Sequence, residues 1–414
     1  MPANNTMSKN ILIIIGATTV ILLIGAWGYL FLFGAPGSVT QVLNNLRSPD
    51  TPYEQPITGS TDTTVAIGNK NLAQLTTKST AGFVLIKTAS GSAVRYAEKG
   101  TGHIYEINLT SGTEERIGGT TFANTAEAYF SGDGSEIILV TIDGTDRKVV
   151  WRRSIDSAEP IALPANSYDF AWNDDGVLRY TVKESGVTVA YENRDGNPQE
   201  LWRTPLSDVR VFFNQSETFL VNNPAPRLSG GLYEVKDNTL VREAGPEYAF
   251  TGMPDPTGQF LLYRYFDTEN QTAVAKILDT YSNQETISAL PAVPEKCAFS
   301  PAKQRVWCAS SFMLLWRDRE YLNKWYRGEV SSPDSLWVSN YNNFESASLV
   351  VDFSEEAGFD IDVVDMKVSD DGAMLLFRNK INDALWMYRL SEVSGEVEQE
   401  PTSEVVGATT TDAS

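Results

Sequence analysis

Acidic residues recur in the turns of this chain, and they are the first residue types that could do chemistry. Aspartates stand at Asp133, Asp174–Asp175, Asp255 and Asp370–Asp371, each in a polar turn between apolar segments. Paired carboxylates cleave glycosidic bonds, and rings of them hold cations. Asp side chains also bond to the backbone amides of turns. Recurrence at successive turns favours this structural interpretation, although 53 acidic residues leave a carboxylate pair for glycan cleavage open.

The chain has a single histidine, His103, within the strand-like segment GHIYEINL. One histidine excludes a multi-histidine metal site and disfavours a Ser-His-Asp hydrolase. We expect His103 to be a structural strand residue. No nucleophile elbow, phosphate-binding loop, dinucleotide-binding or zinc-protease motif occurs. The sequence therefore predicts no catalytic residue, no metal ligand and no cofactor.

The only cysteines, Cys297 and Cys308, occupy mirrored positions on the two arms of one hairpin, CAF–SPAKQ–RVWC. Opposed residues on antiparallel strands are close enough for a disulfide, so we predict that the two cysteines are bonded. The alternatives are two free core thiols or a redox pair. A redox role is disfavoured because no C-x-x-C motif is present.

A basic, aromatic segment at about residues 310–333 stands out in a chain of net charge −20. The part from Arg317 to Tyr326 lacks Pro and Gly and is expected to form a short helix with Leu322, Trp325 and Tyr326 on one face. One interpretation is that this face packs on the body of the protein. The other is a partner-binding site, since Trp, Tyr and Arg are enriched at interaction hot spots. Its candidate residues are Trp316, Tyr321, Trp325, Tyr326 and Arg327.

A repeated hairpin positions all these residues. The segments FSGDGSEIIL (Phe130–Leu139) and VSDDGAMLLF (Val368–Phe377) each read as strand, tight turn and apolar strand. Turn residues of five successive copies are separated by steps of 42, 41, 41 and 46, and a last step of 68 contains the basic segment. The turn residues are Gly134, Gly176, Glu217, Gly258, Gln304 and Gly372. A period of 40–45 residues predicts an all-β, seven-bladed β-propeller, with one more unit around Gly82.

This hairpin motif resembles the TolB-like and WD40-like propeller repeats. The resemblance covers roughly residues 78–390, and it departs from WD40 repeats in lacking a WD dipeptide that closes each blade. It implies a propeller fold and says little about function. The β-sandwich alternative does not explain a constant step between successive hairpins. The layout also resembles uncharacterised bacterial proteins with an N-terminal anchor and an exported propeller.

An uncharged apolar segment, Ile11–Phe33, precedes the repeats. Its 23 residues span roughly 34 Å as a helix, which is enough to cross a bilayer. We expect an uncleaved signal anchor, because a cleaved signal peptide has a shorter apolar region. Lys9 before the span places the N-terminus in the cytoplasm and the rest of this single-pass membrane protein outside it.

The domain boundaries follow from these segments. A cytoplasmic tail (1–10) and the transmembrane helix (11–33) are followed by a tether (34–75), the propeller (76–390, with the insertion 310–333 in its sixth blade) and a disordered acidic tail (391–414). Propellers close their ring by pairing strands from both ends. We expect TTVAI, Thr63–Ile67, to pair in the last blade with Ala384–Leu390.

The acidic surface, with a pI of about 4.5, disfavours a nucleic-acid partner. The function expected from the sequence is a non-enzymatic, protein-binding or scaffold module of the cell envelope. The alternatives are an envelope glycan-active enzyme with a carboxylate site in the propeller funnel, and a TolB-like partner in envelope assembly. A ring of carboxylates facing the funnel distinguishes the enzyme, and an exposed aromatic patch distinguishes the binding module.

Overall fold

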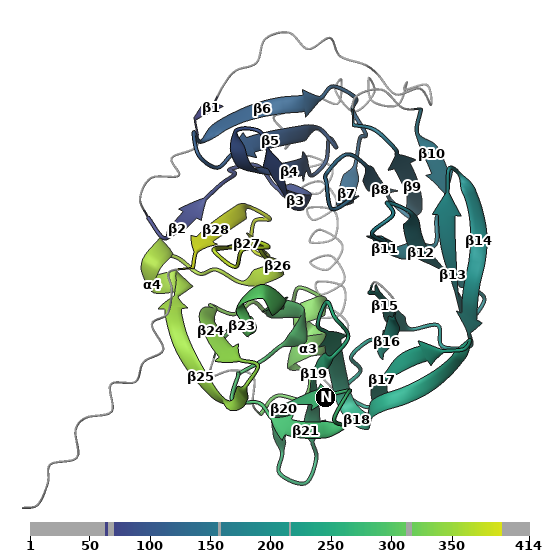
Figure 1. Ribbon diagram of the computed structural model, residues 1–414, viewed down its shortest axis with the longest axis vertical. Helices are drawn as coiled ribbons and strands as arrows, with labels where there is room; N and C mark the ends of the chain where they lie inside the picture. Colours follow the sequence, from purple (N-terminus) through teal and green to yellow (C-terminus); the bar gives the residue numbers. More distant parts are fainter. Residues whose placement is uncertain (1–62, 65–69, 156–158, 215–216, 312–316, 391–414) are drawn as a thin grey trace, which may run out of the picture. The chain divides into compact units, whose positions relative to one another are not determined.

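A computed structural model describes residues 63–64, 70–155, 159–214, 217–311 and 317–390, all of which belong to one compact unit. Strands dominate it (Figure 1). In the described part of the chain the helices are α3 (Tyr321–Tyr326), α4 (Phe353–Ala357) and the single 3₁₀ turns η1 (Pro294–Lys296) and η2 (Pro301–Lys303). The all-β prediction is confirmed.

The first three sheets follow one another along the chain, and each is an antiparallel meander. The first contains β3 (Thr80–Thr88), β4 (Gly91–Glu98), β5 (Ile104–Asn108) and β6 (Thr113–Gly118), with β1 (Thr63–Thr64) at its edge. The second contains β7 (Thr125–Phe130), β8 (Ile137–Asp143), β9 (Asp146–Arg152) and β10 (Ile161–Leu163). The third contains β11 (Ser167–Trp172), β12 (Leu178–Glu184), β13 (Val187–Arg194) and β14 (Asn197–Thr204).

The next sheet has seven strands because one long strand belongs to two meanders. It contains β15 (Val209–Phe213), β16 (Thr218–Asn222), β17 (Ser229–Lys236), β18 (Thr239–Pro254), β19 (Phe260–Asp267), β20 (Thr272–Asp279) and β21 (Gln284–Ile287). The 16-residue β18 pairs with β17 through its first part and with β19 through its last part.

Two further sheets complete the unit. One contains β22 (Cys297–Ser300), β23 (Arg305–Ser310), β24 (Ser335–Asn340) and β25 (Asn343–Asp352), and α3 lies in the connection between β23 and β24. The last contains β26 (Val363–Val368), β27 (Met374–Asn379) and β28 (Leu385–Arg389), with β2 (Leu72–Gln74) as its outer strand.

The sheets surround a common centre, and strands β3, β7, β11, β15 and β26 lie nearest to it (Figure 1). Neighbouring sheets bury apolar side chains against each other, as Trp151 of β9 does with Tyr180 of β12. The last sheet packs on the first through Leu376 and Phe83, so both ends of the chain share one core. This packing is how four-stranded sheets bury both of their faces.

The hairpin turns are where the sequence predicts them. Gly134, Gly176, Gly258 and Gly372 have positive φ, and so does Gln304, which takes the same place in its turn. Asp133 accepts the backbone N–H of Ser135 at 3.0 Å, and Asp371 accepts that of Ala373 at the same distance. These contacts confirm the structural interpretation for these two turn aspartates.

Cys297 and Cys308 face each other across β22 and β23, with their Cα atoms 4.1 Å apart, and form a disulfide. The predicted bond is therefore confirmed. It lies in the core between β19–β20 and β22–β23, where Leu262 and Ile277 pack on it.

The prediction of which segment closes the ring is wrong in its residues. Leu72–Gln74 pairs with β28, in register with Tyr388, Met387 and Trp386. Thr63–Thr64 pairs instead with β6 of the first sheet. The apolar residues explain the choice, because Leu72 and Leu75 are buried against the last sheet and its neighbour. The tether, expected to reach residue 75, thus ends before β2.

The predicted transmembrane helix at 11–33, the cytoplasmic tail at 1–10 and the acidic tail at 391–414 lie outside the described residues. Among the residues that the structure does describe, no helix has both the length and the apolar character needed to cross a membrane.

Closure of the ring through β2 predicts a large effect of Leu75→Ala. Leu75 is 1% exposed, and its truncation is expected to cost about 2–5 kcal/mol of unfolding free energy in a urea melt. The control is Leu349→Ala, because Leu349 of β25 is 55% exposed and its truncation should cost well under half as much. Equal losses for the two variants would show that β2 does not close the ring.

Candidate functional site

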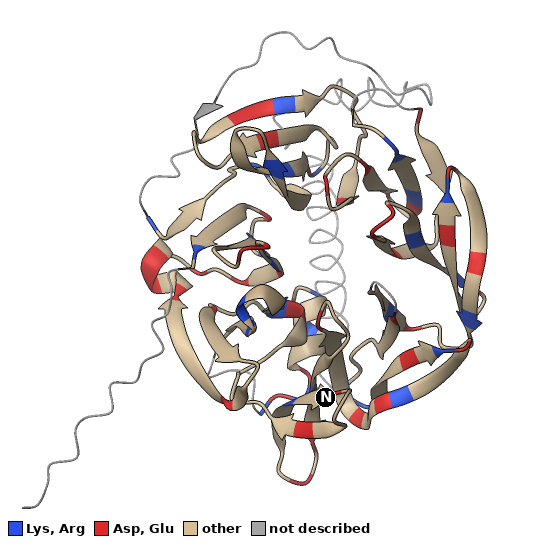
Figure 2. Cartoon of the chain, in the orientation of Figure 1, with Lys and Arg blue, Asp and Glu red and all other residues tan. Residues whose placement is uncertain are grey.

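The innermost strands of successive sheets each present a polar side chain near the centre. Glu127 comes from β7, Asp169 from β11, Arg210 from β15 and Asp365 from β26. Acidic and basic residues are interspersed over the sheets (Figure 2). Because the side chains come from strands far apart in sequence, only the closed ring brings them together.

A simple spacing rule identifies these residues in the sequence, and the sequence analysis missed it. Each stands seven positions before the turn residue of its repeat, as Asp365 stands before Gly372. The same position holds Glu127, Asp169, Arg210, Thr251, Cys297 and Asp365. The turn aspartates drew attention because their pattern is conspicuous, whereas this position varies in residue type from repeat to repeat.

β-Bulges direct two of these carboxylates. The pairing register of β11 shifts between Tyr168 and Ala171, and that of β26 shifts between Val364 and Lys367. Asp169 and Asp365 lie within the shifts, at φ of 53° and 52°. Positive φ is unfavourable for residues other than glycine, although Asp tolerates it better than most. A bulge that re-aims a side chain is a frequent device beside functional sites.

Glu127 and Asp365 line one cavity of about 460 Å³, which we call the axial cavity. Tyr129 Oη donates to Glu127 Oε2 at 2.9 Å, and Arg378 Nε donates to Asp365 Oδ2 at 2.7 Å. The lining residues are Ala81–Phe83, Glu127–Phe130, Phe170, Asp365–Lys367 and Arg378.

Backbone forms part of the wall of the axial cavity. A Cβ atom added to Gly82 would lie 1.8 Å from the carbonyl oxygen of Ala128, so β3 and β7 approach too closely for any side chain there. Lys367 Nζ donates to the carbonyl oxygen of Phe83 at 2.9 Å, which ties β26 to β3. The cavity therefore has a firm wall on the side of β3.

Ionisation in and around the axial cavity is perturbed by desolvation. Burial, followed by the carboxylates of Glu127, Asp365 and Asp169, raises the pKa of Tyr129 well above its usual value. Burial also raises the pKa of Asp169, although Thr181 Oγ1 donates to its Oδ2 at 2.7 Å. Burial lowers the pKa of Lys367, whose side chain is still reached by solvent. Such a set suits proton transfer, which requires groups with displaced pKa values.

A second cavity of about 340 Å³, the insertion cavity, shares Asp365 and Met366 with the axial cavity. Arg210 Nη2 lies 2.8 Å from Glu295 Oε1, and the hydroxyls of Tyr326 and Thr251 also donate to that carboxylate. Burial alone would raise the pKa of Glu295, but Arg210 and these donors outweigh it and lower the pKa.

The predicted partner-binding residues divide into three groups. Tyr321 and Trp325 are buried, together with Leu322, on the face of α3 that packs against Val293. Tyr326 is 42% exposed, and Arg327 lies on the surface in an ion pair with Glu329. Trp316 lies outside the described residues. A helix is present but shorter than expected, at Tyr321–Tyr326, and Tyr321 takes the place expected for Tyr326 on the face with Leu322 and Trp325. That buried face agrees with the packing interpretation.

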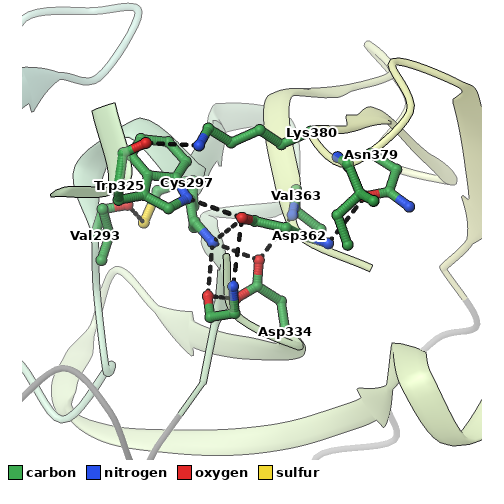
Figure 3. Close-up of polar contacts among 11 residues, drawn as sticks. Val293, Cys297, Trp325, Asp334, Asp362, Val363, Asn379 and Lys380 are labelled. Carbon is green, nitrogen blue, oxygen red and sulfur yellow. Dashed lines mark hydrogen bonds and ion pairs between the residues drawn. The ribbon is translucent and has the colours of Figure 1, made fainter. Parts of the chain in front are cut away.

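A buried lysine, Lys296, anchors this helix. Figure 3 shows Trp325, Asp334 and Asp362, which surround it. Lys296 Nζ lies 2.7 Å from Asp334 Oδ2 and 2.5 Å from Asp362 Oδ1, and all three residues are at most 1% exposed. Trp325 Nε1 donates to both oxygens of Asp362 at 3.0 Å. Burial alone would lower the pKa of Lys296, but the two carboxylates outweigh it and raise the pKa.

Metal binding has little support within residues 70–390. No group of three or more His, Cys, Asp or Glu residues lies close enough to hold an ion in the described part of that range. His103 stands just before β5, with Nε2 2.7 Å from Thr121 Oγ1, and burial lowers its pKa.

Comparison with solved structures gives the fold. An oligogalacturonate lyase in complex with manganese matches with a TM-score of 0.56 and 13% identity, over 81% of this chain and 96% of that one. The oligogalacturonate lyase of Vibrio parahaemolyticus matches with a TM-score of 0.56 and 11% identity, over 81% of this chain and 97% of that one. The β-propeller domain of the trilobed protease of Pyrococcus furiosus has a TM-score of 0.48 and 10% identity, over 74% of this chain and 95% of that one.

The chain is a β-propeller. At these identities the likeness shows the propeller fold alone, and it confirms that part of the prediction. No protein-family model matches the chain. No curated protein matches it either.

The expectation of a non-enzymatic scaffold needs correction. The structural neighbours with the higher TM-scores are enzymes, and the alternative of a glycan-active propeller enzyme agrees better with them. Two carboxylates, Glu127 and Asp365, line the axial cavity, where the enzyme alternative expected a ring of them. The scaffold interpretation was wrong because it depended on the lack of a contiguous motif, whereas these residues come from separate repeats.

The buried cluster of Lys296, Asp334 and Asp362 predicts a large effect of Lys296→Met. The change leaves two carboxylates buried without their cation, which is expected to cost about 3–5 kcal/mol of unfolding free energy. In the control Lys324→Met, an exposed ion pair with Asp318 is lost, and the cost should stay below about 1 kcal/mol. A chemical melt of both variants decides the matter, and similar losses would contradict a stabilising role of the cluster.

Proposed function

We propose that this propeller is an enzyme that cleaves a glycan in its axial cavity. The observation that supports the proposal is that Glu127 and Asp365 line the same cavity with Tyr129, whose pKa is raised by both and by the neighbouring Asp169. Glycoside hydrolysis needs one carboxyl group that holds a proton and a second that is ionised. Carboxylates in different environments can meet this need.

Asp169 is the proposed general acid, because burial raises its pKa and favours the protonated form. Asp365 is the proposed base or nucleophile, since it is paired with the Arg378 guanidinium at the cavity wall. Glu127 and Tyr129, joined by a hydrogen bond, would bind hydroxyl groups of the sugar. In this scheme the proton of Asp169 passes to the glycosidic oxygen as its bond to the anomeric carbon breaks. Asp365 either attacks that carbon or takes a proton from the water molecule that attacks it.

Elimination at an acidic sugar is the second candidate. Its support is Lys367, because burial lowers the pKa of this lysine and so makes it a better base at neutral pH. The neighbouring oligogalacturonate lyases are enzymes named for an acidic glycan. The two reactions differ in their products, since only elimination leaves an unsaturated sugar.

The proposal includes the location of the enzyme. Seven blades follow if the seven-stranded sheet counts as two blades that share β18. The segment at 11–33 would anchor the chain in the cell membrane, with the propeller outside the cytoplasm and facing envelope glycans. A TolB-like role with an envelope protein partner stays a prediction.

The activity is tested with the full-length chain in detergent. The substrates are cello-oligosaccharides, chito-oligosaccharides and oligogalacturonides, and the measurements are new reducing ends and the ultraviolet absorbance of unsaturated products. Asp365→Asn is expected to lower the rate by about 10²-fold or more. Asp360→Asn, at an exposed position nearby, is the control and should leave the rate unchanged. Absence of cleavage across the panel would contradict the proposed function.

The raised pKa of Asp169 predicts the pH dependence. An acid must be protonated to act, so kcat/KM should fall as pH rises through the pKa of Asp169. Because burial raises that pKa, the fall in kcat/KM should lie above the usual pKa of an aspartate, which is about 3.9. Thr181→Val removes a hydrogen bond that favours the ionised form and should move the fall to still higher pH. A shift to lower pH would contradict the assignment of Asp169 as the acid.

A further inference from the structure

A third cavity extends the axial cavity in the opposite direction from the insertion cavity. It has about 460 Å³, and we call it the turn-side cavity because hairpin-turn residues line much of it. It shares Lys367 with the axial cavity. Its lining residues are Val84–Lys87, Ser92, Gly132–Asp133 and Lys367–Asp371.

The three cavities follow one another along a single strand. Residues 364–366 of β26 line the insertion cavity, 365–367 line the axial cavity, and 367–368 with the following turn line the turn-side cavity. β26 has six residues and extends over about 16 Å at the usual strand rise. The order of the residues is the order of the cavities.

Two other innermost strands repeat this order. On β3, residues 81–83 line the axial cavity and 84–87 the turn-side cavity. On β7 and its turn, residues 127–130 line the axial cavity and 132–133 the turn-side cavity. β3 also contacts β26 through the bond from Lys367 to the Phe83 carbonyl. Three strands thus border the axial and turn-side cavities, and β26 alone continues along the insertion cavity. We call the three cavities together the groove along β26.

The charges of this groove are largely paired within the protein. The three linings together contain four cations and six carboxylates. The cations are Lys87, Arg210, Lys367 and Arg378, and the carboxylates are Glu127, Asp133, Glu295, Asp365, Asp370 and Asp371. Lys87 pairs with Asp370, Arg210 with Glu295 and Arg378 with Asp365. With a chain charge of −20, this balance disfavours a polyanion and suits a ligand rich in hydroxyl groups.

We infer that the groove along β26 binds an extended, uncharged glycan chain over several sugar units, with the axial cavity between two flanking subsites. The inference rests on the proposed function, whose cleavage site would be the axial cavity. Aromatic residues Phe212 and Tyr326 line the insertion-cavity end, and Lys87 with Asp370 border the turn-side end. A short sugar would occupy only part of this length.

Gly132 offers a way to block one end of the groove. A Cβ atom added there has no other atom within 4 Å, and its φ lies outside the glycine-favouring range, so a larger side chain fits the backbone. Because Gly132 lines the turn-side cavity and not the axial cavity, Gly132→Phe should obstruct the turn-side cavity and leave the carboxylates of the axial cavity in place. Gln199→Phe, on the exposed face of the outer strand β14, is the matched control.

The test measures binding by titration calorimetry to the full-length chain carrying Asp169→Asn, which prevents turnover. The probes are cello- and chito-oligosaccharides from disaccharide to hexasaccharide, and oligogalacturonides of the same lengths. Affinity for the neutral series should rise about tenfold or more with length. Gly132→Phe should remove that gain and leave disaccharide binding unchanged, while Gln199→Phe changes neither.

Binding that is independent of length, or that is unaffected by Gly132→Phe, would overturn the extended groove. Tighter binding of oligogalacturonides than of either neutral series would overturn the uncharged ligand. If affinity follows length but the unmodified chain cleaves none of these sugars, the groove stands and the proposed activity fails. No binding of any probe would overturn both.

Discussion

The cluster around Lys296 is the interaction on which the arrangement of the site depends. One ammonium group is held between Asp334, which precedes β24, and Asp362, which precedes β26, so a single cation joins the last two sheets. Opposite charges at such distances attract strongly in a low-dielectric interior. Removing each ion from water costs several kcal/mol, so the cluster stabilises the fold only if neighbouring groups form the hydrogen bonds that water would have formed. Here Ser332, Trp325 and the backbone N–H of Val363 supply those neighbours.

The same cluster determines where the insertion lies. Asp362 accepts the indole N–H of Trp325, and Lys380 donates to the carbonyl oxygen of Trp325 at 2.6 Å. This fixes α3, and with it Tyr326, whose hydroxyl reaches Glu295 in the insertion cavity. Lys296 and Glu295 are adjacent in η1. In this short turn Glu295 lines the insertion cavity and Lys296 belongs to the buried cluster. The insertion, for which the sequence left packing and partner binding open, is thus part of the support of the site.

The fold was largely predictable, because its determinants are local. Turn residues such as Gly134 and Gly372 need positive φ, and apolar strands such as Ile137–Val140 need burial, and both leave a visible pattern. The mirrored cysteines were likewise predictable from hairpin register. Closure was harder, since Leu72–Gln74 is too short to be distinguished from the tether by composition.

The candidate site was hidden for a different reason. Asp169 and Asp365 are functional candidates because bulges and ring closure bring them near Tyr129, and neither effect is written in a contiguous motif. Nothing in the local sequence distinguishes Lys296 from a surface lysine. Its burial depends on Asp334 and Asp362, which are 38 and 66 residues away in sequence. Long-range pairing of this kind cannot be inferred from one sequence.

The shared strand β18 has a consequence for how the protein opens. Hydrogen bonds run without interruption from β15 to β21, so the two meanders joined by β18 cannot separate without breaking its pairing. Cooperative units revealed by amide hydrogen exchange usually coincide with such continuous motifs. The amides of strands β15 to β21 should therefore exchange as one block, while the other sheets open individually. Local opening would then concentrate at the boundaries between the other sheets, and the stiffest part of the ring would be the sheet that carries Arg210, Phe212 and Met253 of the insertion cavity.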